Sequence, residues 1–290
     1  MQAIIAAFTP IWIIGALGWL AARFGVASGH VQRALTEFAF TIAMPAVLFT
    51  TLSRTPLGQI QPRPLLAFAL STFAVGLPAL ALIRGKLPDR VIGAMSSAYV
   101  NSGNLGIPVG LYVLHDATFV VSVMVFQILV VSPLIFLGLG AERSSLLAPL
   151  RTPIVAASIL GLGMSALGLH LPDPVSGPLE ILGGAAVPLA LFSLGMSLKG
   201  SAIAWRATGP VVALKLLLQP LMAFLAGRLL HLDGPALFAA VLFAGLPTAQ
   251  NTYVYAAEYG RPTELPRDAI LLSTFLSMAT LTLIALLGTG

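Results

Sequence analysis

Two apolar stretches of the chain are interrupted by glycine, proline and amide residues. The first interruption reads Asn-Ser-Gly-Asn-Leu-Gly-Ile-Pro over residues 101–108, and the second reads Gly-Leu-Pro-Thr-Ala-Gln-Asn over residues 245–251. Glycine and asparagine tolerate non-helical dihedrals, and proline suits the first turn of a new helix. Each interruption therefore predicts a helix that stops and restarts, with the free N–H groups of a half-helix exposed at the break.

Half-helix N-termini inside a membrane favour an anion, above all a carboxylate. The amide and hydroxyl side chains beside them add hydrogen-bond donors. We expect substrate-binding positions at Asn101, Asn104, Pro108, Pro247, Thr248, Gln250 and Asn251, and helix breaks at Gly103, Gly106 and Gly245. The alternative interpretation is a pair of proline kinks that only help the helices to pack.

Lys215 is the only basic residue deep inside a predicted span. A charge at that depth costs about 3 kcal/mol on insertion scales, so a functional role is predicted by default, with the lysine attracting a carboxylate. The alternative is a lysine whose flexible stem reaches the cytoplasmic surface. Gln127 and Gln219 are expected to bond backbone groups freed by the breaks, or to line the cavity.

The elements that carry these residues are predicted to be membrane helices. The chain is 58% hydrophobic and 9% charged, with a mean hydropathy of +0.97, whereas a soluble domain carries about 25% charged residues. Apolar runs bounded by charged or turn residues predict an all-α membrane protein with ten transmembrane helices. The predicted spans are 3–22, 32–52, 64–83, 91–114, 117–140, 153–170, 178–198, 207–230, 235–258 and 268–288.

The ten spans are predicted to form two copies of one five-helix repeat. In one fixed register, which we call the repeat register, Thr9-Pro10-Ile11 falls on Thr152-Pro153-Ile154, Gly25 on Gly168, Glu37 on Glu180 and Pro45 on Pro188. The repeats are 1–140 and 153–290, joined by a cytoplasmic loop at 141–152. An odd number of spans inverts the second copy, which is the architecture of secondary transporters. In the repeat register Asn104 falls on Pro247 and Pro108 on Asn251.

The positive residues predict the orientation and exclude a nucleic-acid partner. With the N-terminus outside, the cytoplasmic loops hold eleven Lys and Arg and the external loops three, which is the bias expected of a membrane protein. Both termini are therefore expected to be extracytoplasmic, in the plasma (inner) membrane. The fifteen basic residues are scattered singly, without a basic patch. The apolar N-terminus is read as the first span and not as a removable signal.

Catalytic and metal chemistry have no candidates in the sequence. The chain has no cysteine, and its four histidines lie near predicted loops without metal-ligand spacing. It contains no nucleophile elbow, zinc-protease motif or phosphate-binding loop. We therefore expect no enzyme activity, no metal and no cofactor beyond a coupling ion.

The interruptions resemble those of the auxin efflux carrier family of bacterial and plant permeases. The matching stretches are N-S-G-N-L-G-I-P at 101–108, G-L-P-T-A-Q-N-T-Y-V-Y-A-A-E-Y at 245–259 and K-L-L-L-Q-P at 215–220. The short loop at 141–152 is similar to that of bacterial members. The resemblance implies the fold of sodium/bile-acid symporters and sodium/proton antiporters, in which broken helices 4 and 9 cross.

The resemblance implies further properties of the fold and of transport. Spans 1, 2, 6 and 7 would form a scaffold, through which relatives form homodimers. Spans 3–5 and 8–10 would form a transport domain that moves like an elevator. The substrates would be organic anions such as auxin or dicarboxylates, and the crossover positions would be Asn104, Pro108, Pro247 and Asn251.

Several functions remain open at this level. The first is a secondary active transporter, or permease, for a small carboxylate. A sodium-coupled symporter is the second, and the coupling ion could be H⁺ or Na⁺. An antiporter of this fold would use carboxylates at mid-membrane, and no predicted span has an aspartate in its interior. The last alternative is an anion channel, because broken helices also line channels.

Overall fold

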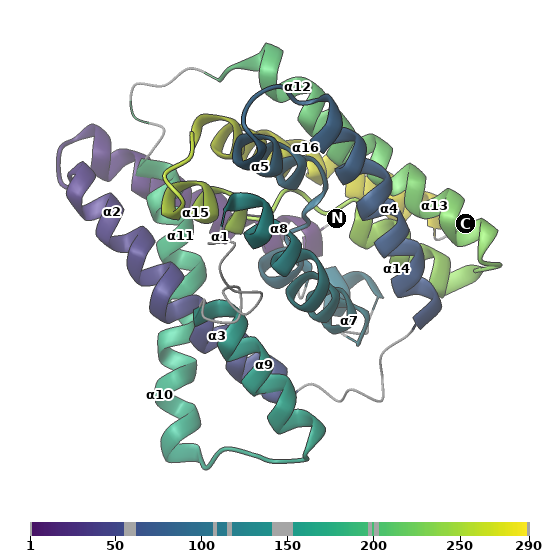
Figure 1. The fold of residues 1–290 in the computed structure, drawn as a ribbon, viewed down its shortest axis with the longest axis horizontal. Coiled ribbons are helices and arrows are strands. Elements are labelled where there is room, and N and C mark those ends of the chain that lie inside the picture. Colours follow the sequence, from purple (N-terminus) through teal and green to yellow (C-terminus); the bar gives the residue numbers. More distant parts are fainter. Residues whose placement is uncertain are drawn as a thin grey trace. The chain divides into compact units, whose positions relative to one another are not determined.

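The regular elements of the computed structural model are helices, joined by turns and short extended segments in its described residues. These contain no strand beyond one isolated β-bridge, so the all-α prediction is confirmed for that part of the chain. The predicted connecting loop at 141–152 lies outside the described residues. The structure describes residues 2–54, 62–106, 109–114, 118–140, 153–196, 199 and 203–288 (Figure 1).

Six helical stretches are long and apolar enough to cross a membrane, counted over the described residues. They correspond to six of the predicted spans, and three shorter apolar helices fall in the predicted spans 3–22, 153–170 and 235–258. The long stretches are Gly29–Ser53, Pro62–Leu82, Ser122–Leu139, Asp173–Ser193, Trp205–Leu229 and Glu264–Gly288. The chain is thus a multi-pass membrane protein, and the count of ten spans stays a prediction.

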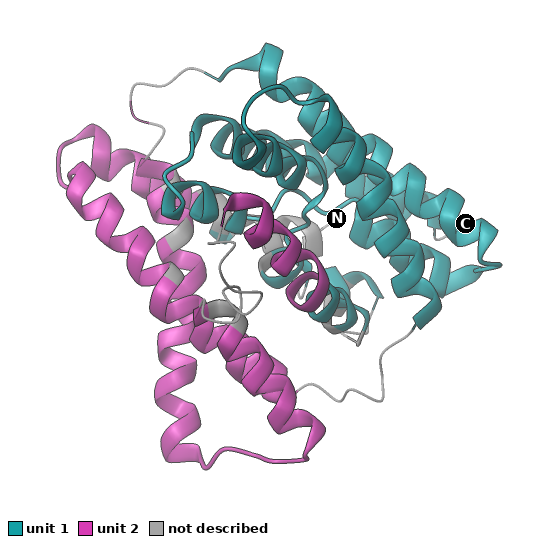
Figure 2. Ribbon diagram, viewed as in Figure 1, with its two compact units in different colours: residues 1–10, 61–126, 202–290 teal, residues 11–60, 127–201 magenta. Residues whose placement is uncertain are grey.

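The helices gather into two compact units, coloured separately in Figure 2. Unit 1 comprises residues 1–10, 61–126 and 202–290, and unit 2 comprises residues 11–60 and 127–201. The long helix α1 (Gln2–Arg23) contributes to both. The other elements of unit 2 are α2 (Gly29–Phe38), η1 (Ala39–Ala43), α3 (Met44–Ser53), η5 (Gln127–Val131), α8 (Ser132–Leu139), α9 (Pro153–Ala166), α10 (Asp173–Gly184) and α11 (Ala186–Met196).

Unit 2 is held by close helix packing at glycines, because α1 meets α11 and α9 lies beside α3 (Figure 1). The missing side chain of Gly18 lets α1 approach the carbonyl of Phe192. Gly161 does the same on α9, where a Cβ atom would lie 2.7 Å from the carbonyl oxygen of Phe49. The repeat register places Gly18 on Gly161 and Phe49 on Phe192. The two contacts are therefore equivalents in the register found in the sequence.

The ends of α1 and α9 repeat the same relationship. Gly25 follows α1 with φ +74°, and Gly168 follows α9 with φ +64°. A left-handed residue after the last turn closes a helix at little cost only when it is glycine. These two glycines also fall on each other in the repeat register, so α1 and α9 end with the same kind of cap at matching positions.

Unit 1 contains the two interrupted helices. Its helix α4 contacts α5, α13 and α14. The elements are α4 (Pro62–Leu82), α5 (Leu87–Ala98), η3 (Ser102–Gly106), η4 (Gly110–Leu114), α7 (Thr118–Phe126), α12 (Trp205–Ala213), η7 (Leu214–Leu218), α13 (Gln219–Leu229), α14 (Gly234–Ala244), α15 (Asn251–Glu258) and α16 (Glu264–Gly288).

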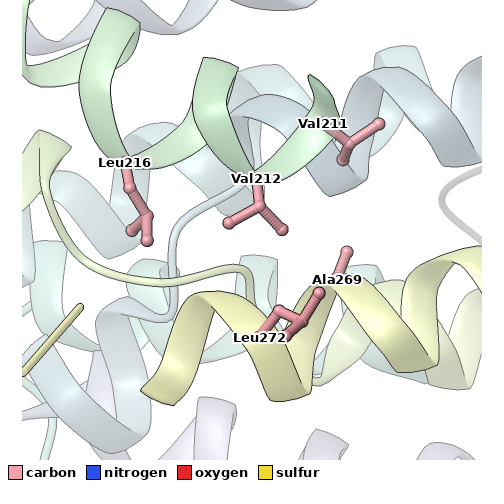
Figure 3. Packing of buried hydrophobic residues seen from close by; sticks show 5 residues of the cluster. All are labelled: Val211, Val212, Leu216, Ala269 and Leu272. Atoms are coloured by element: carbon pink, nitrogen blue, oxygen red, sulfur yellow. The ribbon is translucent and has the colours of Figure 1, made fainter. Parts of the chain in front are cut away.

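A buried apolar cluster joins α12 and η7 to α16 (Figure 3). The side chains of Val212 and Leu216 lie on the side of α12 and η7 that faces Ala269 and Leu272. Close packing of such side chains fixes the rotation of a helix about its axis. The cluster therefore sets which way η7, and Lys215 within it, faces.

Three π-helical turns have a common cause in proline. The turns η1, η5 and η7 end two residues before Pro45, Pro133 and Pro220. A proline ring clashes with the carbonyl four residues earlier and offers no N–H, and a widened turn relieves that clash. The prolines therefore place irregular turns inside otherwise continuous helices.

Candidate functional site

The two interruptions lie against each other in unit 1. After α5 ends at Ala98 and α14 ends at Ala244, the chain becomes extended, and Val100 pairs with Thr248 in an antiparallel bridge. The N–H of Asn101 donates to the carbonyl of Pro247 at 2.9 Å, and the N–H of Ala249 donates to the carbonyl of Tyr99 at 3.0 Å. The backbone groups freed by one break are thus bonded by the other. We call residues 99–101 and 247–249 the crossing.

The crossing has its own internal symmetry. In an antiparallel pair, a local two-fold axis exchanges the two residues that face each other. Val100 faces Thr248 here, whereas the repeat register places Val100 on Phe243. The crossing therefore does not follow the repeat register.

Thr248 ties the crossing to two neighbouring helices. Its hydroxyl donates to the carbonyl of Ser96 on α5 at 2.7 Å. Its N–H donates to the hydroxyl of Ser273 on α16 at 3.0 Å. The side chain of Thr248 is fully buried, so both bonds are shielded from competing solvent. Thr248 is thus a structural centre of the crossing, and Ser96 and Ser273 are partners that sequence reasoning missed.

Lys215 lies beside the crossing and is fully buried, with 0% of its surface exposed. Its ammonium group donates to Gln219 Oε1 at 2.5 Å and to the carbonyl of Ala244, the last residue of α14, at 2.9 Å. The interpretation of Lys215 as a surface-reaching lysine is therefore wrong. None of the ion pairs formed by the described residues involves Lys215.

Gln219 completes this arrangement. Its Nε2 donates to the carbonyl of Ala98, the last residue of α5, at 2.9 Å, and to the hydroxyl of Thr72 on α4 at 3.3 Å. The expectation that Gln219 bonds a backbone group freed by a break is confirmed. The signal in the sequence was its place four residues after Lys215, which lets the two side chains meet on one helix face.

The second halves of the interrupted helices begin at the crossing. Helix α15 starts at Asn251, directly after Gln250 as its N-cap residue, and the turn η3 starts at Ser102. Asn251 is partly exposed, whereas Asn101 and Gln250 are buried. Thr252 carries a buried hydroxyl without a hydrogen-bond partner among the described residues. The N–H groups of Thr252 and Tyr253 donate to the carbonyls of Ala249 and Gln250 at 3.1 and 3.0 Å. The start of α15 thus combines the positive end of its helix dipole with polar side chains.

The structure brings most of the predicted site residues together and leaves two undecided. Pro108 and the side chain of Asn104 lie outside the described residues. The residues found at the crossing or in contact with it are Asn101, Lys215, Pro247, Thr248, Gln250 and Asn251.

At two of the three break glycines a side chain would meet a close neighbour, and none of the three has a backbone conformation that requires glycine. Gly103, Gly106 and Gly245 all lack a positive φ. A Cβ atom on Gly106 would lie 2.8 Å from Val120 Cγ2, and one on Gly245 would lie 2.7 Å from Ile284 Cδ1, whereas Gly103 has open space. A side chain at Gly106 or Gly245 would therefore press on a neighbour, which at Gly245 is the flexible end of the Ile284 side chain.

Two ion pairs lie near the starts of α5 and α16. Arg261, after α15, donates through Nε to Asp89 in the first turn of α5 at 2.9 Å. Asp268 is fully buried in α16, where it pairs with Arg267 at 2.7 Å and accepts from the N–H of Ala204 at 3.0 Å. Asp268 is thus engaged as an ion-pair partner and as a cap for the start of α12.

Comparison with known proteins gives transporters over the whole length. The chain is 28% identical over 306 residues to the Rhizobium meliloti protein named "Putative malonate transporter", covering 97% of this chain and 95% of that protein. It is 24% identical over 293 residues to an uncharacterized transporter of Methanocaldococcus jannaschii, covering 94% and 95% of the two chains.

A plant relative matches a part of the chain. The rice protein named "Probable auxin efflux carrier component 5c" is 31% identical over 139 residues, which cover 45% of this chain and 38% of the rice protein. The family described as Membrane transport protein matches residues 3–145 and 140–285. This family and these relatives are transporters and not enzymes, in agreement with the sequence-based prediction. The chain therefore belongs to the Membrane transport protein family, the family of the auxin efflux carriers.

Proposed function

We propose that this transport protein is a secondary active transporter, a permease, for a small organic anion that carries a carboxylate. The observation that carries the proposal is the crossing of two interrupted helices beside a fully buried lysine, Lys215. A half-helix N-terminus in a membrane favours negative charge. Irregular backbone at that depth belongs where it is buried or lines a cavity.

The local charges favour an anion over a metal cation. The hydrogen-bond partners of the buried Lys215 are Gln219 and the carbonyl of Ala244, and neither is a carboxylate. The ion pair Asp89–Arg261 lies at the other ends of α5 and α15, and the carboxylate of Asp268 is engaged by Arg267 near the start of α16. A carboxylate bound near the start of α15 would favour the protonated form of Lys215, and Asn101, Gln250 and Asn251 would donate to the carboxylate.

The two units are consistent with alternating access. We propose that unit 1 supplies the moving transport domain and unit 2 the scaffold, in an elevator-like motion. The equivalent contacts Gly18–Phe192 and Gly161–Phe49 support the inverted repeat on which such motion depends. In this assignment span 5 is shared, because α7 belongs to unit 1 and η5 and α8 belong to unit 2.

The setting in the membrane is part of the proposal. The excess of basic residues in alternate loops supports an inner-membrane protein with both termini outside. Exposed apolar side chains on unit 2, such as Leu160 and Ile181, would face lipid or a second copy in a homodimer. The name of the Rhizobium relative makes malonate the first substrate to test.

Uptake of labelled malonate into proteoliposomes tests the proposal. We expect saturable uptake and counterflow exchange, and we expect Asn251→Ala and Lys215→Met to reduce both strongly. Parallel runs with a sodium gradient or a pH gradient would identify the coupling ion, and uptake that follows sodium alone would favour the symporter alternative. A flux that does not saturate, without counterflow, would favour a channel. Normal transport by the variants would overturn the site.

A second measurement addresses the substrate class directly. A ligand that binds only the folded protein raises its melting temperature. We expect malonate and other small carboxylates to raise the melting temperature of the detergent-purified protein, and uncharged amides of the same size to leave it unchanged. A panel in which amides stabilise as well as acids would contradict the role of negative charge.

A further inference from the structure

We propose that Lys215 and Gln219 act as one clamp that holds the C-terminal ends of both interrupted helices and thereby positions the crossing. The inference rests on the proposed function for the identity of the anion but not for the clamp itself. The ammonium of Lys215 holds the last carbonyl of α14, and the amide of Gln219 holds the last carbonyl of α5. The two side chains are joined to each other at 2.5 Å.

The clamp answers a specific physical problem. The last carbonyls of a helix have no partner within the helix and carry the negative end of its dipole. Inside a membrane no bulk water is available to bond them. Ala98 and Ala244 end two helices at the same place, so two negative ends would otherwise meet there. The Lys215 side chain bonds the terminal carbonyl of α14, and the Gln219 amide bonds the terminal carbonyl of α5.

The orientation of the Gln219 amide follows from its neighbours. Its oxygen must accept from the ammonium of Lys215, so its nitrogen must turn toward the carbonyl of Ala98. The hydroxyl of Thr72 on α4 lies 3.3 Å from the same nitrogen and supports it from the other side. The clamp thus has a single hydrogen-bond arrangement that bonds the terminal carbonyls of both α5 and α14. Removing either Lys215 or Gln219 also removes the bond that orients the other side chain.

This arrangement makes Lys215 a positioning residue. Two of its three N–H donors are already taken by Gln219 and Ala244. The extended backbone of the crossing follows the clamped carbonyls immediately, because Val100 lies two residues after Ala98 and Thr248 lies four after Ala244. Lys215 therefore acts on the anion mainly by fixing the crossing from which α15 starts.

Cross-linking measures the position of the crossing without any substrate. Val100 and Thr248 form a non-hydrogen-bonded antiparallel pair, in which Cα atoms lie about 4.5 Å apart, and a disulfide accepts that separation. The chain has no cysteine of its own. A Val100→Cys/Thr248→Cys variant of the full chain in proteoliposomes should therefore cross-link rapidly under mild oxidation, whereas each single variant should not.

The test compares Lys215→Met, Gln219→Leu and the double substitution, made both in the cysteine pair and in the unmodified chain. We expect each single substitution to slow cross-linking, and to raise the KM for malonate, by about tenfold, as for a lost hydrogen bond to a charged group. The double substitution should do no more than either one, because the clamp works as a unit. Leu217→Met is the control, since Leu217 lies in the same turn but is 64% exposed.

Several results would overturn the clamp. Additive effects of the two substitutions would mean that the residues act independently, and an unchanged cross-linking rate in Gln219→Leu would remove Gln219 from the arrangement. If Lys215→Met does not fold, Gln219→Glu decides instead, because it keeps an acceptor for Lys215 but loses the donor to Ala98. Absence of malonate uptake in the unmodified chain would overturn the proposed function, while the cross-linking rates would still decide the clamp.

Discussion

Val100 and Thr248 face each other across the isolated antiparallel bridge of the described chain and join the two places where membrane helices are interrupted. Apolar helices normally contact through side chains, because their backbone groups are bonded within each helix. Here the backbone of one interruption bonds the backbone of the other at two points. The crossing is thus a hydrogen-bonded junction of two backbones. The side chains of Thr248, within it, and of Lys215 and Gln219, beside it, hold it in place.

The hydroxyl of Thr248 should matter more than that of Thr252. Thr248→Val removes the donor to the carbonyl of Ser96, and an unsatisfied buried acceptor costs about 1–3 kcal/mol. Thr252→Val removes a hydroxyl that has no partner among the described residues, so stability should stay the same or rise. Melting temperatures of the two purified variants check this difference. Equal destabilisation by both would contradict it.

Gly106 and Gly103 lie in the same turn and should respond differently to alanine. A Cβ atom on Gly106 would press on Val120 and on Phe243, whereas Gly103 has open space. Overpacking a buried contact costs about 1–3 kcal/mol, so Gly106→Ala should lower both the melting temperature and the transport rate. Gly103→Ala is the matched control and should change neither. A larger loss at Gly103 would mean that its backbone freedom, and not space, matters there.

The buried ion pair at the start of α16 should be far more sensitive than an exposed one. Asp268→Asn leaves the buried Arg267 without its carboxylate, which costs about 3–5 kcal/mol. Asp233→Asn breaks a pair with Arg228 whose side chains are 58% and 77% exposed, and should cost about 1 kcal/mol or less. The yield of monodisperse protein and its melting temperature measure both. If the two variants lose the same amount of stability, the buried bonds of Asp268 to Arg267 and to the N–H of Ala204 are contradicted.

Sequence reasoning located the interruptions and the special lysine because their signals are residue types. Prolines, glycines and amides stand out in apolar spans, and so does a single cation such as Lys215. The role of Lys215 could not be predicted, because its partner on α14 is a main-chain carbonyl, and every residue has one. The same holds for Ser96, whose carbonyl bonds Thr248.

The repeat register matches the contacts in one region and does not match them in another. The repeat register relates Gly18 to Gly161 and Phe49 to Phe192 in the packing of unit 2. It fails at the crossing, where the residue facing Val100 is Thr248. The two interruptions carry different polar residues, so their residue types do not reveal the backbone pairing between them.

The glycines at equivalent helix contacts give the last prediction. Gly18→Val and Gly161→Val should each destabilise the protein by more than the about 1–3 kcal/mol usual for overpacking, since the new side chain meets a backbone carbonyl that cannot turn away. Gly163→Ala is the control, because Gly163 lies in α9 with nothing within 4 Å, and alanine favours a helix over glycine. Folded yield and melting temperature in detergent measure all three. If Gly18→Val and Gly161→Val differ widely, with one of them tolerated like Gly163→Ala, the two contacts are not equivalent parts of a repeat, and the inverted architecture proposed here loses its main structural support.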